Sequence, residues 1–495
     1  MHSSVVYFSH ILLAFGAFAS PSFKSLRVDT TVGTVEGFID TSNPGVAQWL
    51  GIPFAEPPVG SLRWVEPVPK AKVHSLIEAK VAPKSCAQYA NPNATVFNQI
   101  VPEFLASAPF SEDCLYLNVI APAGPRKKLP VLFWVHGGEI QYGGINTPYE
   151  HPQKWVERTQ SHIVVMINYR LNIFGFPNAK GLAEKNFGLL DQRLASEWVR
   201  ANIEAFGGDP ERITGWGHSA GGSAVDAHQF AWPNDLIFNS IIIESGVIIM
   251  GMTSNDPDQL SFSYIAQQAG CSANLTAEEE VHCLRSVNSH IISTVIMGHV
   301  KSGAVPALYF SAHADGKRIF TVSEYMARGM AGQYADVPLL LGTNAQEATS
   351  IIPFAEASQL SAGNITLLTE TILQCPTAVT SKYRATSGRS TYRYYYAGNF
   401  SNISPVPWLG AYHFSELPLI MGTHSDYRGK STPFQYSLSH KMQDLWLAFA
   451  KDPHNGLECH GWTPYASDGK AQVFGKNDVL VQTENIESLD AACNL

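Results

Sequence analysis

Apolar residues occur along the middle of the chain in two patterns, short continuous runs and runs with helical spacing. Residues 129–135 (LPVLFWV) and 163–167 (IVVMI) are continuous apolar runs, typical of strands buried on both faces of a sheet. Between residues 190 and 206 the apolar positions recur at the spacing of one helical face. Strand and helix patterns alternate in this way from about residue 116 to 245. Such alternation predicts an α/β fold with a mostly parallel sheet.

The same patterns continue towards the C-terminus. Residues 213–216 predict a short strand that leads into a glycine-rich turn, and residues 237–243 and 337–341 predict further buried strands. Residues 435–450 predict an amphipathic helix that ends before Pro453. The sequence has no internal repeat and no low-complexity linker, so nothing in its pattern divides these elements into separate units.

The first 19 residues have the pattern of a secretory signal peptide. Residues 5–19 are almost entirely apolar, and Ala17 and Ala19 provide the small residues that precede a cleavage site. A membrane anchor is the alternative, but the apolar run is shorter than the roughly 20 residues that cross a bilayer. We therefore expect residues 1–19 to be removed and the protein to be secreted, extracellular and without a stable membrane anchor. Five glycosylation sequons fit secretion: Asn93, Asn274, Asn364, Asn399 and Asn402.

The composition is that of a globular protein. Of the 495 residues, 45% are hydrophobic and only 15% are charged, which excludes a disordered chain. The net charge of −9 argues against a nucleic acid or an anionic membrane surface as a partner. The seven cysteines are an odd number, so at least one stays outside any disulfide within the chain.

A candidate nucleophile lies in the glycine-rich turn. Residues 217–221 (GHSAG) match the pattern G-x-S-x-G, in which a serine sits on a sharp turn between a strand and a helix. A short strand precedes Ser219, and residues 220–227 can begin a helix. An ordinary glycine-rich turn is the alternative interpretation. His218 is adjacent to Ser219, but neighbouring side chains diverge on such a turn, so we expect a structural role for His218 and a base from elsewhere in the chain.

Several motifs in order resemble the type-B carboxylesterases, the carboxylesterase, lipase and cholinesterase group of α/β-hydrolases. The matching segments are GIPFAEPPVG at 51–60, EDCLYLNV at 112–119, NYRL at 168–171, GLLDQ at 188–192 and FGGDPERITGWGHSAGG at 206–222. The last departs from the family pattern at Gly215, where an aliphatic residue is usual. The spacing near the C-terminus looks most like fungal secreted members. The resemblance implies an α/β-hydrolase fold, with a large, mostly parallel central sheet flanked by helices and insertions that form an active-site gorge. It also implies that residues 20–495 form a single domain.

The resemblance supplies the rest of a catalytic triad. Residues 342–347 (GTNAQE) look like the family's acid motif, and residues 410–417 (GAYHFSEL) look like its histidine motif. The implied triad is Ser219 as nucleophile, Glu347 as acid and His413 as base, in the chain order of α/β-hydrolases. His413 would take the serine proton, and Glu347 would orient the imidazole. The implied reaction is hydrolysis of a small-molecule carboxylic ester through an acyl-enzyme, without a cofactor.

The resemblance also implies an oxyanion hole. Residues 136–139 (HGGE) look like the family's His-Gly-Gly-Gly loop, so the backbone N–H groups of Gly138, Glu139 and Ala220 are the implied donors. Glutamate at 139 departs from the small residue usual there, and an ionised carboxylate aimed at an oxyanion would oppose catalysis. Our hypothesis is that Glu139 turns away from the substrate, into solvent or towards a hydrogen-bond donor. The alternative hypothesis is that it faces the substrate and selects against anionic acyl groups.

The cysteines can be paired in part. The family's two disulfides match Cys86–Cys114 and Cys271–Cys283, which leaves open which pair forms among Cys375, Cys459 and Cys493. The sequence shows no spacing of residues typical of a metal site.

The sequence leaves open which ester is the substrate and whether the protein is an esterase, a lipase or a non-catalytic binding protein. The segment between Cys86 and Cys114 contains aromatic residues but no tryptophan, which lowers the odds of a choline ester, because cholinesterases hold the ammonium there by cation–π attraction. A lipase that acts on longer acyl chains is the first alternative to an esterase. A non-catalytic, cholinesterase-like binding protein is the second, although it would be expected to lack triad residues.

Overall fold

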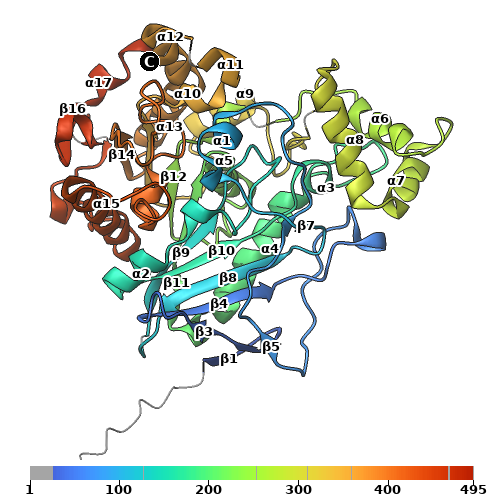
Figure 1. Cartoon of the computed structure of the whole chain (residues 1–495), viewed down its shortest axis with the longest axis horizontal. Coiled ribbons are helices and arrows are strands. Elements are labelled where there is room, and N and C mark those ends of the chain that lie inside the picture. The colour runs from blue at the N-terminus through green and yellow to red at the C-terminus, as the bar shows by residue number, and fades with distance from the viewer. Residues whose placement is uncertain are drawn as a thin grey trace, which may run out of the picture.

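A large twisted sheet forms the centre of the protein (Figure 1). The computed structural model describes residues 26–493 except 126, 252, 309, 358 and 466–468, so the expected signal peptide lies outside the described residues. Within them the sheet has 11 strands in the order β16-β15-β14-β13-β12-β11-β9-β10-β8-β4-β3. Its strands are β3 (Phe38–Ile39), β4 (Val46–Pro53), β8 (Tyr116–Pro122), β9 (Leu129–Val135), β10 (Ile163–Ile167), β11 (Gly208–His218), β12 (Ser240–Glu244), β13 (Leu339–Asn344), β14 (Thr391–Tyr396), β15 (Lys470–Phe474) and β16 (Val481–Asn485).

The strands from β15 to β10 run parallel to one another, and antiparallel pairs close both edges of the sheet. The expected mostly parallel sheet is therefore confirmed. Two small sheets lie outside it. Their strands are β1 (Arg27–Thr30), β2 (Gly33–Glu36) and β5 (Ile77–Glu78) in one, and β6 (Ser85–Cys86) and β7 (Phe110–Ser111) in the other.

Helices cover both faces of the central sheet (Figure 1). The helices of the described residues, whether on the sheet or beside it, are α1 (Val96–Gln99), α2 (Gln153–Thr159), α3 (Asn172–Gly175), α4 (Phe187–Asn202), α5 (Ala220–Ala231), α6 (Leu260–Gln268), α7 (Ala277–Ser286), α8 (Ser289–Ser302), α9 (Val322–Met330), α10 (Ala348–Ile351), α11 (Phe354–Ala357), α12 (Ala362–Thr369), α13 (Cys375–Thr386), α14 (Leu417–Met421), α15 (Pro433–Lys451) and α17 (Ile486–Leu489).

The side chains of β9 point alternately to the two faces of the sheet, and this explains why two cores form. Val131, Phe133 and Val135 belong to a core that also includes residues of α4 and α5, while Leu132 and Trp134 belong to a second core with α2, α14 and α15. Successive side chains of a strand point to opposite faces of the sheet, so a continuous apolar run fills both cores. A third apolar cluster lies among α6, α7 and α8, at one side of the sheet (Figure 1).

Three disulfides join six of the seven cysteines, all of which lie within the described residues. Cys86 is bonded to Cys114 and Cys271 to Cys283, the two pairs that the resemblance implied. The pairing that the sequence left open is Cys375–Cys493, which ties the start of α13 to the last described residue. Cys459 is free and exposed.

The five sequons differ in accessibility. Asn93, Asn274, Asn364 and Asn399 are exposed. Asn402 is buried: its amide group donates to the carbonyl of His424 at 2.7 Å and accepts from Gln435 at 3.0 Å. A glycan on Asn402 would break these bonds. We therefore do not expect Asn402 to carry a glycan in the folded protein.

Candidate active site

The predicted site residues gather where the parallel strands end. Ser219 follows β11, Glu347 follows β13, and the loop of residues 136–139 follows β9. His413 lies in the long segment after β14. In an open α/β sheet the carboxyl ends of parallel strands meet along one edge, which is where ligands bind. The topology thus brings together segments that lie almost 280 residues apart in the sequence, from residue 136 to residue 413.

The turn at Ser219 has a strained backbone that its neighbours enforce. Ser219 has φ 55° and ψ −126°, between the end of β11 and the first residue of α5. A Cβ added to Gly217 would lie 2.3 Å from the carbonyl oxygen of Gly221, and one added to Gly221 would lie 2.0 Å from that of Val135. Both glycines of the G-x-S-x-G pattern are therefore needed for the turn to pack against β9.

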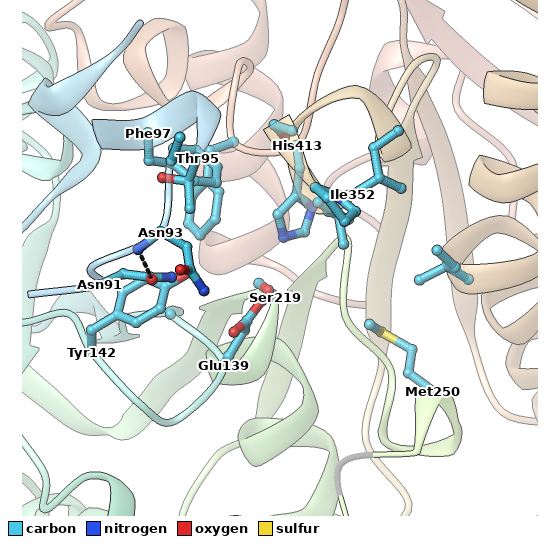
Figure 2. A pocket seen from close by; sticks show the side chains of 17 residues that line it. Asn91, Asn93, Thr95, Phe97, Glu139, Tyr142, Ser219, Met250, Ile352 and His413 are labelled. Atoms are coloured by element: carbon cyan, nitrogen blue, oxygen red, sulfur yellow. Dashed lines mark hydrogen bonds between the residues drawn. The ribbon is translucent and has the colours of Figure 1, made fainter. Parts of the chain in front are cut away.

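His413 and Glu347 are in contact. The Nδ1 atom of His413 lies 2.6 Å from Oε2 of Glu347. The other oxygen, Oε1, accepts hydrogen bonds from the backbone N–H of Asn344 at 2.6 Å and from the hydroxyl of Ser245 at 2.5 Å. Glu347 is fully buried, and Ser219 is only 8% exposed. Figure 2 shows the His413 ring directed towards Ser219, so the three residues can act on one bound molecule.

Ser219 and His413 open into a cavity of about 330 Å³. Its lining combines polar residues with a group of aliphatic residues on α10 and the segments beside it (Figure 2). The cavity is lined by Asn91, Asn93, Ala94, Thr95, Phe97, Gly138, Glu139, Tyr142, Ser219, Met250, Ser350, Ile351, Ile352, Pro353, Ile372, His413 and Phe414. A space of this size and chemistry suits a small organic molecule.

The loop after β9 packs directly on the turn at Ser219. A Cβ added to Gly137 would lie 2.8 Å from the carbonyl oxygen of His218 and 3.1 Å from Cβ of Ser219. Gly138 has φ 101°, which only glycine adopts without strain. Ala220 is the first residue of α5, so its N–H group has no acceptor within the helix. The three predicted donors thus lie around the serine, and two of them, Gly138 and Glu139, line the cavity beside it.

A neutral histidine anchors this loop. His136 is buried, its ring stacks on Tyr169 with centroids 4.6 Å apart, and the Tyr169 hydroxyl donates to the His136 carbonyl at 2.9 Å. Burial lowers the pKa of His136 to about 4. The ring is therefore uncharged at neutral pH, so it places no positive charge next to the site.

Glu139 lies on the wall of the catalytic cavity. Figure 2 shows its carboxyl group on the same side of the cavity as Ser219. The residue is exposed to solvent, although the protein packed around its carboxyl raises the pKa above its ordinary value, and nearby His413 lowers it. Glu139 both lines the cavity and is exposed to solvent, so a carboxyl directed into solvent or towards a donor and a carboxyl that faces the substrate both stay hypotheses.

A second group of ionisable residues is buried behind the triad. The Nε2 atom of His218 lies 3.1 Å from Oε1 of Glu416, and the ring stacks on Phe414 with centroids 3.9 Å apart. Burial lowers the pKa of His218. Burial alone would raise the pKa of Glu416, but His218 and the Asn344 amide hold it below its ordinary value. Burial and the charge of Glu416 raise the pKa of Glu244 well above its ordinary value. His218 thus contacts Glu416, and its ring centroid lies 4.6 Å from that of His413, which is consistent with the structural role expected from its place in the turn.

The sequence did not single out Ser245, Asn344 or Glu416, although each contacts a triad residue or its support. Ser245 follows the end of β12, and Asn344 is the last residue of β13. The rule that the ends of parallel strands converge could have identified both. Glu416 lies three residues after His413, and only the fold shows that it faces His218.

Neither a metal site nor a membrane span is found in the part of the chain that the structure describes. No group of three or more His, Cys, Asp or Glu side chains there has the arrangement of a metal site. None of the described helices is both long enough and apolar enough to cross a bilayer.

The family model described as "Carboxylesterase family" matches residues 24–364 and 355–488, nearly the whole chain. Two fungal proteins are similar over most of their length. A chlorogenic acid esterase of Aspergillus niger is 43% identical over 438 residues, which cover 88% of this chain and 84% of that protein. Secreted lipase 5 of Gibberella zeae is 41% identical over 483 residues, which cover 90% of this chain and 89% of that protein.

A solved structure has the same architecture. The structure of a thermophilic pNB esterase superposes with a TM-score of 0.79, covers 95% of this chain and 99% of its own, and is 25% identical in sequence. The sheet order, the position of the site and these similarities agree on one fold, which is the hydrolase fold that the sequence motifs implied.

Proposed function

The chain belongs to the carboxylesterase family and is a carboxylic ester hydrolase, and from this premise we propose that Ser219, His413 and Glu347 are its catalytic triad. The observation that carries the proposal is the contact of 2.6 Å between His413 and a Glu347 carboxylate buried beside the serine turn. A free serine hydroxyl is a weak nucleophile and needs a base positioned to take its proton.

The first half of the reaction forms an acyl-enzyme. Because Nδ1 of His413 is engaged by Glu347, its Nε2 faces the serine and takes the proton from Oγ as Oγ bonds to the ester carbonyl carbon. The carbonyl oxygen becomes an oxyanion, and the backbone N–H groups of Gly138, Glu139 and Ala220 donate to it. The bond to the alcohol oxygen then breaks, and His413 gives its proton to the leaving alcohol.

The second half releases the acid. A water molecule takes the place of the alcohol and gives a proton to Nε2 of His413 as its oxygen bonds to the acyl carbon. The bond between the acyl carbon and Oγ of Ser219 breaks, and Oγ recovers the proton from His413. Glu347 stays ionised throughout, and it stabilises the imidazolium in both halves.

The test uses a chromogenic ester. We expect the purified protein to hydrolyse para-nitrophenyl butyrate, and Ser219→Ala to reduce kcat by about 10⁴-fold or more, because no other group replaces the nucleophile. A Ser219→Ala variant with wild-type turnover would refute the triad. Circular dichroism of the variant serves as the control for folding.

Two features of the site bear on the alternatives. The non-catalytic alternative is expected to lack triad residues, and against it stand two observations: Ser219 and His413 line one cavity, and Glu347 contacts His413 at 2.6 Å. One similar protein is named an esterase and the other a lipase, so their names do not decide the chain length. A series of para-nitrophenyl esters from acetate to palmitate decides between them: we expect the highest kcat/KM with acyl groups that fit inside the cavity of about 330 Å³, a volume suited to a small organic molecule, and a lower value for palmitate.

We also propose that residues 1–19 are a signal peptide and that the secreted protein is one domain beginning at Ser20. Support comes from the apolar segment that ends at Ala19 and from the relative named a secreted lipase. Expression in a fungal host followed by N-terminal sequencing of the medium fraction tests this, with Ser20 expected as the first residue. Retention of the full-length chain in cells would contradict it.

A further inference from the structure

The catalytic cavity has two walls of different chemistry, and Ser219 lies between them (Figure 2). One wall is polar and comes from the segment after Cys86 and from the oxyanion loop. The other wall is aliphatic and comes from the segment around α10 and from Met250. The polar side chains of this wall are Asn91, Asn93, Thr95, Glu139 and Tyr142, and the same segments also contribute Ala94, Phe97 and Gly138 to the lining. The aliphatic wall consists of Met250, Ile351, Ile352, Pro353 and Ile372.

Such a cavity selects a substrate with two unlike halves. The five side chains of the aliphatic wall offer no hydrogen-bonding group, and from the same segment only the hydroxyl of Ser350 on α10 also lines the cavity. Most polar groups placed there would therefore lose their bonds to water without replacing them. The polar wall offers amide, hydroxyl and carboxyl oxygens as acceptors, which suit the hydroxyl groups of a ligand. Since the serine lies between the walls, the ester bond is placed where these two halves meet.

Glu139 keeps its side chain on the polar wall despite an unfavourable backbone. Its φ is 57°, in the left-handed region where glycine is favoured, and Gly138 before it and Ile140 after it also have positive φ. Glycine at 139 would relieve this strain and would still provide the backbone N–H group of the oxyanion hole. A strained residue that persists beside a nucleophile points to a role for its side chain.

Glu139 lies near enough to Tyr89 and His413 for electrostatic interaction with both. Burial raises the pKa of Tyr89 to about 12, and the Glu139 carboxylate contributes to that shift. The carboxyl also interacts with His413 from the other side. An ionised Glu139 would repel a second carboxylate on a substrate bound beside it, whereas an uncharged hydroxyl group could donate to Glu139.

We propose that Glu139 is a specificity-determining residue, and that the preferred substrates are esters joining an apolar half to an uncharged, hydroxyl-bearing half. This inference rests on the proposed function of the same site, and it adds the substrate class. It assigns three tasks to one residue: the backbone N–H of Glu139 serves the oxyanion, its carboxyl oxygens accept from substrate hydroxyls, and its charge disfavours anionic esters.

The test compares esters that differ in charge and in hydroxyl content. Glyceryl monobutyrate is neutral and hydroxylated, and ethyl butyrate is neutral without a hydroxyl group. Butyryl glycolate carries a carboxylate on the alcohol half, and ethyl hydrogen succinate carries one on the acyl half. We would measure kcat/KM at pH 8 for the wild type, Glu139→Gln and Glu139→Ala. Glu278→Gln is the matched control, because it removes one exposed carboxylate from the first turn of the distant helix α7.

For Glu139→Gln we expect the kcat/KM of at least one anionic ester to rise about tenfold relative to glyceryl monobutyrate, since the size is kept and the charge is removed. For the wild type we expect about a tenfold preference for glyceryl monobutyrate over ethyl butyrate, and Glu139→Ala should reduce it towards parity. Glu278→Gln should keep all wild-type ratios.

Two results would overturn the inference. The first is a Glu139→Gln variant whose anionic-to-neutral ratios equal those of the wild type in both series. The second is a wild type without preference for the hydroxylated ester. Either result, with ester hydrolysis intact and dependent on Ser219, leaves the proposed function standing. A wild type that hydrolyses none of the esters would instead overturn the proposed function, and this inference with it.

Discussion

Glu347 shows how hydrogen bonds stabilise a buried carboxylate at the site. The carboxylate is fully buried, yet His413, Asn344 and Ser245 all lie within hydrogen-bonding distance of its two oxygens. A buried charge is tolerated when hydrogen bonds of this kind replace its hydration. Ser245 is thus a positioning residue, because it acts on the substrate only through Glu347 and His413.

Removal of the Ser245 hydroxyl should slow the chemical step. Hydrogen bonds to charged groups contribute about 1.5–3 kcal/mol, so we expect Ser245→Ala to lower kcat by about 10- to 100-fold with little change in KM. Steady-state kinetics with para-nitrophenyl butyrate measures both parameters. A rise in KM at unchanged kcat would contradict a role in orienting the triad, and Ser245→Cys, which retains a weak donor, should recover part of the rate.

Glu150 should make stability depend on pH. It is buried with the Trp134 indole N–H donating to it at 2.9 Å, and burial raises its pKa to about 8. Because the folded pKa exceeds the unfolded value, its contribution is fully present below about pH 4.5 and is lost as pH rises towards 8. Glu150→Gln removes the titration and keeps an acceptor for Trp134.

We therefore expect Glu150→Gln to match the wild type near pH 4.5 and to be more stable by a few kcal/mol near pH 8.5. Thermal unfolding at the two pH values measures the difference. A variant that shows the same pH dependence as the wild type would refute the assignment of a buried, neutral Glu150.

Among residues, the sequence predicted the ones that carry chemistry better than the ones that support them. Ser219 could be identified from the pattern of its own turn. Glu347 and His413 could be identified only from the family resemblance, because the sequence contains many other acidic residues and histidines that could equally have been the acid and the base. The supporting contacts, such as His218 with Glu416, depend on which side chains converge in space. No local pattern encodes that convergence.

At the level of elements, the central strands were predictable because they are buried on both faces. The expected strands 129–135 and 163–167 coincide with β9 and β10, and helix α15 extends one or two residues beyond the predicted segment 435–450. β14 was missed, since its sequence TYRYYY has a buried arginine and no continuous aliphatic run. Arg393 is tolerated there because it pairs with Asp490, a contact visible only in the fold.

The departure from the family pattern at Gly215 also has a physical reason in a neighbouring element. A Cβ added to Gly215 in β11 would lie 2.7 Å from Cδ2 of Phe238 and 2.9 Å from Cγ1 of Val225. The Phe238 ring thus fills the space that an aliphatic side chain would need.

Gly215→Val should consequently overpack this core and destabilise the protein by about 1–3 kcal/mol. Phe238→Leu in the same chain should restore part of the loss, because it vacates the space. Gly298→Val is the control, since a Cβ at Gly298 in α8 meets nothing within 4 Å. Equal melting temperatures for Gly215→Val and the wild type would show that the strand has room at this point.

For the whole molecule, the sequence motifs and the observed topology agree on one hydrolase fold. The pairing of cysteines far apart in the sequence could not be predicted from the sequence. Three cysteines were left without assigned partners, and only the folded chain brings Cys375 to Cys493. The two lie 118 positions apart, so no local spacing marks them as a pair. The accessibility of Asn402 was hidden in the same way, because a sequon does not show whether its asparagine is buried.

The Cys375–Cys493 disulfide should stabilise the C-terminal part of the fold. We expect the double variant Cys375→Ala/Cys493→Ala to lose about 2–4 kcal/mol, chiefly because its unfolded chain is less constrained. Thermal unfolding under non-reducing conditions measures the loss. Cys459→Ala is the matched control: Cys459 is free and exposed, so its replacement should leave the melting temperature unchanged. Equal effects of both changes would contradict the assigned pairing.

The central claim is that this carboxylesterase acts through an acyl-enzyme on Ser219. Its most direct test is rapid mixing with para-nitrophenyl acetate, acid quench and mass spectrometry of the peptide that contains residue 219. We expect one acetyl group on Ser219, formed in step with a burst of para-nitrophenol and absent in Ser219→Ala and His413→Ala. Turnover with the acetyl group on another residue, or with Ser219→Ala as active as the wild type, would contradict it.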